Sequence, residues 1–116
     1  MSQEDCLFCK ILDGEIPADI VFESDSAIAF RDINPQAPTH VLVIPRRHIA
    51  TINDLEAGDR ELVGDLYLAA KQIAHMEGMA DEGYRAVMNC NAGAGQSVFH
   101  IHLHVLGGRG LTWPPG

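Results

Sequence analysis

Near its end the chain has an otherwise apolar stretch, residues 99–106, in which three histidines alternate with apolar residues. The three are His100, His102 and His104, and branched apolar residues lie between them. Successive side chains of a β-strand point to opposite faces, so a strand would gather the imidazoles on one face and bury the apolar residues on the other. On a helix, residues two apart point in different directions. The alternation therefore predicts a strand with a functional site on one face, rather than the solvated face of an edge strand.

The 116-residue chain has the length of one domain, and we expect that domain to cover residues 1–116. Hydrophobic residues make up 47% and charged residues 21%, which is typical of a globular protein in water. The formal net charge of −8 argues against a nucleic-acid partner, because such partners need a basic surface. A single nucleotide remains compatible with this charge, since one pocket can be positive within an acidic protein.

The beginning of the chain has neither the basic nor the apolar segment of a leader peptide, and no run is long enough to cross a membrane. No lipidation signal is visible. The chain contains three cysteines, an odd number that is not typical of a disulfide framework. We therefore expect a cytoplasmic protein in a reducing environment, with no membrane partner.

Periodicity and turn residues predict two helices and five strands. A short helix over residues 6–12, capped by Asp5, comes first, and a long helix over residues 59–76 precedes the last two strands. The strand at 40–45 is apolar along its length and should be covered on both faces. The fold class is α+β, with both helices expected on one face of a five-stranded antiparallel sheet. The expected strands cover residues 20–23, 27–32, 40–45, 84–90 and 99–106.

Three further segments have more than one interpretation on their own. Cys6 and Cys9 form a C-x-x-C pair, which can be a redox pair, half of a zinc site, or a pair without function. Residues 46–48 (Arg-Arg-His) follow a strand and have two interpretations. They form either a positive rim together with a ligand residue of a site, or a solvated turn. The small-residue loop at 91–97 leads into the histidine strand and would let backbone N–H groups approach an anion.

Two kinds of chemistry fit three alternate histidines. A neutral imidazole can attack phosphorus and form a covalent intermediate, while a neighbouring cationic imidazole holds phosphate oxygens. His102 is the natural nucleophile, because both other histidines flank it on the same face. Alternatively, all three could bind a catalytic metal with an open position. That arrangement is less favourable, because the outer Cα atoms of such a strand are roughly 13 Å apart.

Residues 100–106 match the signature His-φ-His-φ-His-φ-φ, where φ is an apolar residue, of the histidine-triad (HIT) superfamily. The resemblance is strongest to its Hint (histidine-triad nucleotide-binding) branch. It implies a HIT-like fold whose sheet continues across a homodimer, and hydrolysis of purine nucleoside 5′-phosphoramidates through a nucleotidyl-histidine. Segments that carry the resemblance elsewhere are Cys6-Leu-Phe-Cys-Lys-Ile, Gly14-Glu-Ile-Pro, Ala29-Phe-Arg-Asp-Ile, Pro35-Gln-Ala-Pro-Thr-His, Val43-Ile-Pro-Arg-Arg-His, Gly95-Gln-Ser-Val-Phe-His and Trp113-Pro-Pro-Gly.

The resemblance also implies roles for individual residues. His102 corresponds to the nucleophile, His104 and Ser97 to donors for the phosphate and leaving group, and His100 and His40 to residues that orient or support them. Asp32 would bind the ribose hydroxyls, and Trp113 would reach toward the partner subunit's site. The apolar slot for the base, whose members could equally be plain core, would comprise Leu7, Phe8, Ile11, Phe30 and Ile33. The wall beside the sugar and phosphate would comprise Asn89, Gly95, Gln96, Ser97 and Val98.

Some bacterial members of the superfamily bind a structural zinc ion through a C-x-x-C pair and two histidines. By position, the four ligands here would be Cys6, Cys9, His48 and His100, while the reaction itself would need no cofactor. The alternative function, from another class, is a nucleotide-binding interaction module whose hydrolysis is incidental, because binding and catalysis would use the same residues.

Overall fold

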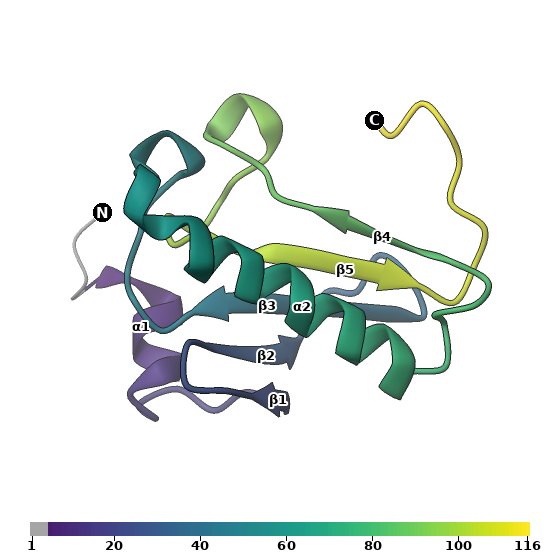
Figure 1. Ribbon diagram of the computed structural model, residues 1–116, viewed down its shortest axis with the longest axis horizontal. Coiled ribbons are helices and arrows are strands. Elements are labelled where there is room, and N and C mark those ends of the chain that lie inside the picture. The colour runs from purple at the N-terminus through teal and green to yellow at the C-terminus, as the bar shows by residue number, and fades with distance from the viewer. Residues whose placement is uncertain (1–4) are drawn as a thin grey trace.

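The computed structural model describes residues 5–116. Residues 1–4, which belong to the beginning of the chain where no leader signal was found, lie outside the described part. Five strands form one antiparallel sheet in the order β1-β2-β3-β5-β4, as Figure 1 shows. This confirms the predicted α+β class and the five-stranded antiparallel sheet. The strands are β1 (Ile20–Glu23), β2 (Ala27–Arg31), β3 (Thr39–Pro45), β4 (Tyr84–Val87) and β5 (Leu103–Gly107).

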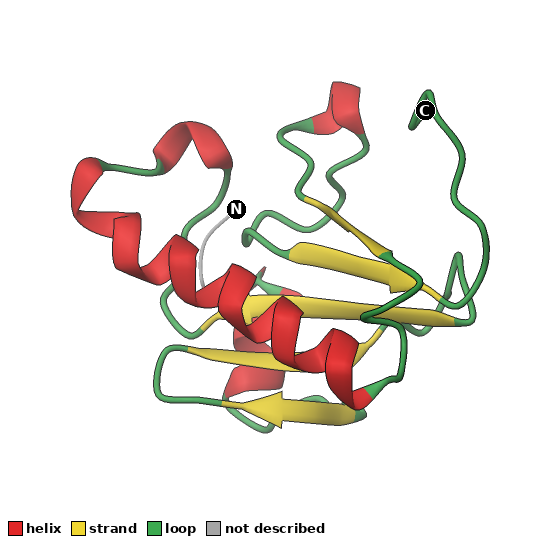
Figure 2. Ribbon diagram, turned by 45° about the vertical axis from the view of Figure 1, so that its right-hand side comes forward, coloured by secondary structure: helices red, strands yellow, loops and turns green. Residues whose placement is uncertain are grey.

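Within residues 5–116 the helices are the short α1 (Leu7–Leu12) and the long α2 (Arg60–Met76), and short 3₁₀ segments lie in the loops. They cover opposite faces of the sheet, so the expectation that both lie on one face was wrong (Figures 1 and 2). The reason lies in β2, which buries both of its faces and therefore needs cover on each side. The 3₁₀ segments are η2 (Ile52–Asp54), η3 (Ala57–Asp59) and η4 (Ala92–Ala94).

The central strand β3 divides its side chains between the two cores. Val41 and Val43 pack into the cluster under α2, whereas Leu42 and Ile44 pack into the cluster under α1. The prediction that this strand is covered on both faces is thereby confirmed. Since alternate residues share a face, His40 lies on the α1 side of the sheet with Leu42.

The histidine stretch is only partly a strand, because β5 begins at Leu103. His100, in a bend, and His102 lie in the segment before β5. The Ile101 N–H of this segment donates to the Ile49 carbonyl at 2.8 Å, and Ile49 does not belong to a strand. The alternation nevertheless holds, since Ile101, like Leu103, is buried in the core under α2. The apolar half of the histidine stretch therefore anchors the segment, and its histidines face the α1 side.

Several other boundaries differ from the prediction by one to three residues, among them the start of α1 and the end of β4. Cys6, not Asp5, is the N-cap of α1, and its Sγ accepts from the Cys9 N–H at 3.3 Å. Strand β4 ends at Val87, where its pairing with β5 also ends, rather than at residue 90. No helix within residues 5–116 has the length and apolar character needed to span a bilayer.

Candidate active site

A cavity of about 550 Å³ opens on the α1 side of the sheet. Its walls come from α1 and the segment after it, from the end of β2, from the middle of β3, and from the segment that carries the histidines. Of the residues proposed to bind a nucleotide, it brings together Leu7, Phe8, Ile11, Phe30, Asp32, Ile33, Ser97, Val98, His102 and His104.

Four other residues proposed for nucleotide binding do not line this cavity: Asn89, Gly95, Gln96 and Trp113. Gln96 is buried, and its side-chain amide bonds the backbone at Asn91, Ala50 and Val98. Its side chain therefore shapes the loop from within. Trp113 is 81% exposed in the C-terminal tail of this single chain.

His102 is held as one tautomer by a backbone group. Its Nδ1 donates to the His100 carbonyl at 2.8 Å, so the Nδ1 carries the proton and the Nε2 keeps its lone pair. Burial lowers the pKa of His102, which keeps the ring neutral near pH 7. Its ring lies 4.9 Å from that of His104 and 5.1 Å from the edge-on ring of Phe8. The site thus presents a neutral imidazole with a free lone pair beside the cavity.

His104 is oriented by a chain of hydrogen bonds that begins at a backbone amide. The Gln36 N–H donates to His40 Nδ1 at 3.1 Å, so the proton of neutral His40 lies on Nε2. That Nε2 donates to His104 Nδ1 at 2.9 Å, which leaves the His104 proton on its own Nε2. Burial, with the neighbouring His102 and His40, lowers the pKa of His104 to about 4. His104 therefore offers an N–H donor beside the lone pair of His102.

Asp32 lies next to this chain at the end of β2. One carboxylate oxygen accepts from the Asn34 N–H at 2.9 Å, and the other lies 3.5 Å from His40 Nε2. Asp32, His40 and His104 are close enough to be considered as metal ligands. The bond from Gln36 argues against that use, because it leaves His40 with a protonated Nε2 and no free lone pair toward the others. Asp32 instead opens to the cavity as a hydrogen-bond acceptor.

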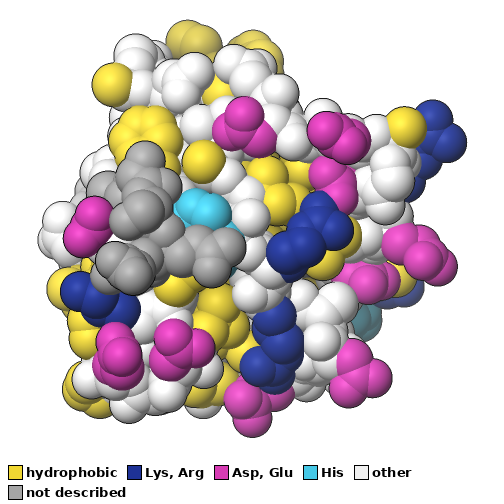
Figure 3. All heavy atoms as spheres, turned by 90° about the vertical axis from the view of Figure 1, so that its left-hand side faces the viewer, with side chains coloured by type: hydrophobic (Ala, Val, Ile, Leu, Met, Phe, Trp, Pro, Cys, Tyr) yellow, Lys and Arg dark blue, Asp and Glu magenta, His cyan; other side chains and the backbone are white. Residues whose placement is uncertain are grey.

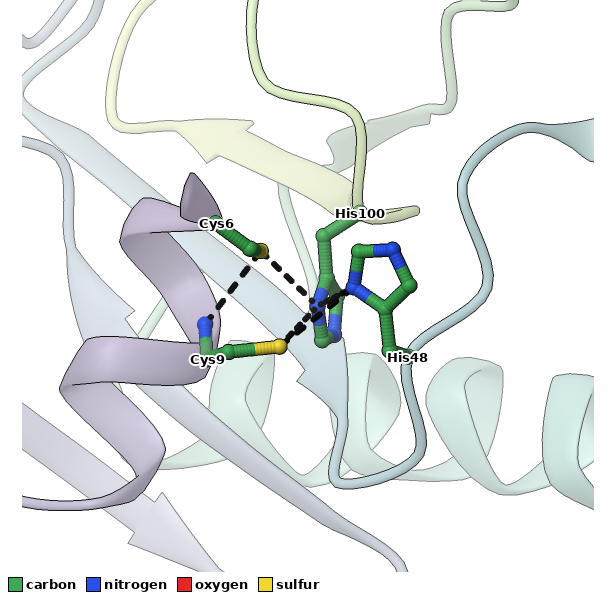
Figure 4. Close-up of side chains that lie close together, drawn as sticks. All are labelled: Cys6, Cys9, His48 and His100. Atoms are coloured by element: carbon green, nitrogen blue, oxygen red, sulfur yellow. Dashed lines mark hydrogen bonds between the residues drawn. The ribbon is translucent and has the colours of Figure 1, made fainter. Parts of the chain in front are cut away.

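The second cluster, Cys6, Cys9, His48 and His100, lies beside the N-terminus of α1 (Figure 4). The His100 Nδ1 lies 3.4 Å from Cys6 Sγ, 3.6 Å from Cys9 Sγ and 3.3 Å from His48 Nδ1. The His48 Nδ1 is 3.3 Å from Cys9 Sγ. Ligand atoms of a tetrahedral Cys₂His₂ zinc ion are about 3.3–3.8 Å apart, so the donor set and its spacing fit that ion.

Two further features of this cluster suit a metal. The His100 Nε2 donates to the Pro45 carbonyl at 2.8 Å, which directs the Nδ1 lone pair to the cysteines and fixes the ring as metal sites commonly do. Burial raises the pKa of the Cys9 thiol to about 11 and lowers that of His100 to about 4. A divalent cation would reverse the effect on the thiol, because it stabilises the thiolate directly.

The three histidines do not converge on one metal, so the triad metal site considered from spacing was wrong. His100 points to the cysteines, His102 to the cavity, and His104 to His40, because each ring meets a different segment of the fold. In particular, His100 contacts His102 through its backbone carbonyl, not through its imidazole.

The basic residues beside His48 are paired with acidic ones. Arg46 lies 3.9 Å from Glu23, and Arg47 bonds Asp59. Figure 3 shows basic and acidic side chains mixed on this end of the molecule. Of the two interpretations of the segment at 46–48, the arginines fit the solvated turn, whereas His48 belongs to the cluster.

Sequence reasoning missed several residues that line the cavity. Leu42 could have been found, since it shares a strand face with His40 two residues away. The others lie in a turn and at strand ends, where periodicity carries no signal. The missed residues are Ile16, Pro17, Ala18, Asp19, Arg31 and Leu42.

Comparisons with known proteins agree with this geometry. Residues 13–111 match the model of the HIT domain. The chain is 53% identical over 113 residues to an uncharacterized HIT-like protein of Synechococcus elongatus, covering 97% of this chain and 98% of that protein. It is 51% identical over 108 residues to the purine nucleoside phosphoramidase of Escherichia coli K12, covering 93% and 91%. The crystal structure of a HIT family hydrolase from Legionella pneumophila superposes with a TM-score of 0.95 at 60% identity, covering 97% of this chain and all (100%) of that one.

Proposed function

The chain belongs to the HIT domain family, and we propose that it is a purine nucleoside 5′-phosphoramidate hydrolase that acts through a nucleotidyl-histidine on His102. The observation that carries the proposal is the bond from His102 Nδ1 to the His100 carbonyl, which leaves Nε2 free as a nucleophile. The phosphoramidase of Escherichia coli, at 51% identity, supports the same reaction.

The reaction divides into two displacements at phosphorus. In the first, His102 Nε2 bonds to phosphorus as the P–N bond breaks, and the electron pair of that bond stays on the amine nitrogen. Negative phosphoryl oxygens favour the protonated form of His104, in which Nδ1 also carries a proton and no longer accepts from His40. The Nε2 of this form delivers its proton to the amine nitrogen, and the neutral His104 that results has a free lone pair on Nε2. In the second, water attacks phosphorus, neutral His104 takes the proton of the water, and His102 is released. The Ser97 hydroxyl, exposed at the cavity, is a further donor to the phosphate or leaving group.

The decisive experiment is to trap the covalent intermediate. Labelled AMP linked to an amine would be mixed with the protein, quenched during turnover, and digested for peptide mapping. We expect label on the peptide that contains His102. Tight AMP binding with hydrolysis no faster than in buffer would instead indicate a nucleotide-binding module.

We propose that Cys6, Cys9, His48 and His100 hold a structural zinc ion, which would supply folding stability rather than chemistry. Elemental analysis of protein purified without chelator should give about one equivalent of zinc per chain. The thiols should be titrated in parallel to show that they are reduced. Reduced protein without metal would contradict the site.

Asp32 is proposed to accept hydrogen bonds from the ribose hydroxyls. Asp32→Ala should raise KM for the AMP–amine substrate about 10-fold with little change in kcat, because it removes a charged acceptor used equally in the ground and transition states. Since Asp32 also bonds the Asn34 N–H, Asp32→Asn serves as a variant that keeps the shape of the turn. A 2′,3′-dideoxy substrate should abolish the difference between the variants and wild type. An unchanged KM with the ribose substrate would remove Asp32 from this role.

We further propose that residues 1–116 form one HIT domain of a cytoplasmic homodimer. Strand β4 lies at one end of the sheet order, so its free edge can pair with the same strand of a partner. Three cysteines outside any disulfide suit a reducing compartment. The acidic net charge supports a small nucleotide rather than a nucleic acid as the partner.

A further inference from the structure

We infer that His100 is a positioning residue through which the metal in the Cys/His cluster fixes the nucleophile. The inference rests on the proposed function and on the proposed zinc. One end of His100, its ring, belongs to the cluster, and the other end, its carbonyl, accepts the Nδ1–H of His102. The cluster would therefore act on the reaction, beyond stabilising the fold.

The first support is the tight constraint on His100. Its side chain is fully buried, and both ring nitrogens are engaged: Nε2 donates to the Pro45 carbonyl and Nδ1 faces the two sulfurs and His48 (Figure 4). Because the ring and the carbonyl belong to one residue, a backbone shift at His100 that displaces the ring also moves the acceptor of His102. That acceptor decides which nitrogen of His102 is free to attack.

A second connection runs through α1. Cys6 caps this helix, and its sulfur accepts from the Cys9 N–H at 3.3 Å. The next residues of the helix, Leu7 and Phe8, line the cavity. The Phe8 ring also lies edge-on to both His100, at 6.0 Å, and His102, at 5.1 Å. A metal that holds Cys6 and Cys9 would therefore hold the wall against which a base packs.

A third connection runs through the segment after His48. The Ile49 carbonyl accepts from the Ile101 N–H, between the first two histidines of the triad, at 2.8 Å. The Ala50 carbonyl accepts from the Gln96 amide at 2.8 Å, and Gln96 holds the loop that carries Ser97. The four ligands thus come from three segments, and each segment continues directly into one part of the site.

A bound metal gives these segments a common anchor. Without the metal, two thiols and two imidazoles would face one another. The single lone pair of His100 Nδ1 would then be the acceptor for Cys6, Cys9 and His48. Such a set allows several alternative hydrogen-bond patterns, because each thiol hydrogen can point to more than one neighbour. A tetrahedral ion selects one of them, because it needs all four lone pairs at once.

The test compares full-length wild type with Cys9→Ser, and with Cys90→Ser as a matched control outside the cluster. Each protein would be assayed for zinc content, for AMP affinity by calorimetry, for kcat and KM, and for the His102 tautomer by ¹⁵N NMR at pH 7.5. Cys9→Ser should lose zinc, bind AMP about 10-fold more weakly, and turn over about 10- to 100-fold more slowly. Its His102 Nδ1 signal should change from a single protonated form to a mixture. Cys90→Ser should match wild type in all four measurements.

A reversible metal exchange separates positioning from misfolding. Wild type stripped of zinc by a chelator, and shown by circular dichroism to remain folded, should acquire the properties of Cys9→Ser and recover them when zinc is restored. If the stripped protein unfolds, the folded Cys9→Ser variant provides the comparison, and if both unfold, the cluster serves folding alone and the inference fails. Wild type without zinc, or folded zinc-free protein with unchanged AMP affinity and a single His102 tautomer, would also overturn it. AMP affinity and the His102 tautomer can be measured without turnover. A protein in which both depend on zinc, but which hydrolyses nothing, would therefore refute the proposed function alone.

Discussion

His102→Asn is expected to bind AMP with near wild-type affinity and to lose at least about 10³-fold in kcat, because the variant has no nitrogen lone pair to attack phosphorus. The asparagine amide can still donate to the His100 carbonyl, which accepts from His102 at 2.8 Å in the wild type. Steady-state kinetics with an AMP–amine substrate and AMP calorimetry measure the two effects separately.

A matched control for this substitution is His75→Asn, because His75 lies exposed near the end of α2. That variant should keep wild-type kcat and KM. Near wild-type turnover by His102→Asn, with His75→Asn also active, would show that His102 is not the nucleophile. Loss of both AMP binding and turnover would point to a structural role for the ring.

His104→Gln is expected to lower kcat about 10²-fold for substrates with an alkylamine leaving group. Glutamine retains an N–H donor, so it can hold a phosphoryl oxygen, but it cannot deliver a proton. The amine nitrogen leaves poorly without one. The variant therefore separates hydrogen bonding by His104 from proton transfer.

The sharpest measurement compares two leaving groups on the same nucleotide. An AMP ester of an acidic phenol departs as a stable anion and needs no proton, so His104→Gln should hydrolyse it at close to the wild-type rate. His102→Asn should fail with both substrates, because both need the nucleophile. Equal losses for the amine and the phenol with His104→Gln would assign His104 to phosphate binding instead of proton delivery.

Local patterns were sufficient for much of the fold. The alternation at 99–106 predicted which side chains enter the core, and Ile101 and Leu103 lie there. The segment at 40–45, in which every residue after His40 is apolar, predicted a strand buried on both faces, as β3 is. These predictions succeeded because side-chain direction in an extended chain alternates with a period of two residues, so residues close in the sequence are enough to reveal it.

The placement of the helices could not be read in the same way. Periodicity shows that a helix has an apolar face, but not which face of the sheet receives it. The apolar residues of β2 bury both of its faces, and α1 and α2 each cover one. The residues at which β4 ends and β5 begins likewise depend on how far the two strands pair with each other.

The sequence by itself determined that the histidines at 100–104 gather on one side while the apolar residues between them enter the core, and resemblance supplied the identities of the other site members. Only the tertiary structure decided what each histidine does there. The register of β3 against β5 pairs Leu42 with His104, and this places His40 diagonally beside His104 within hydrogen-bond distance. The turn of the His100 ring toward Cys6, 94 residues away, leaves its carbonyl as the partner of His102. Contacts between segments so distant along the chain depend on packing, which a local repeat does not encode.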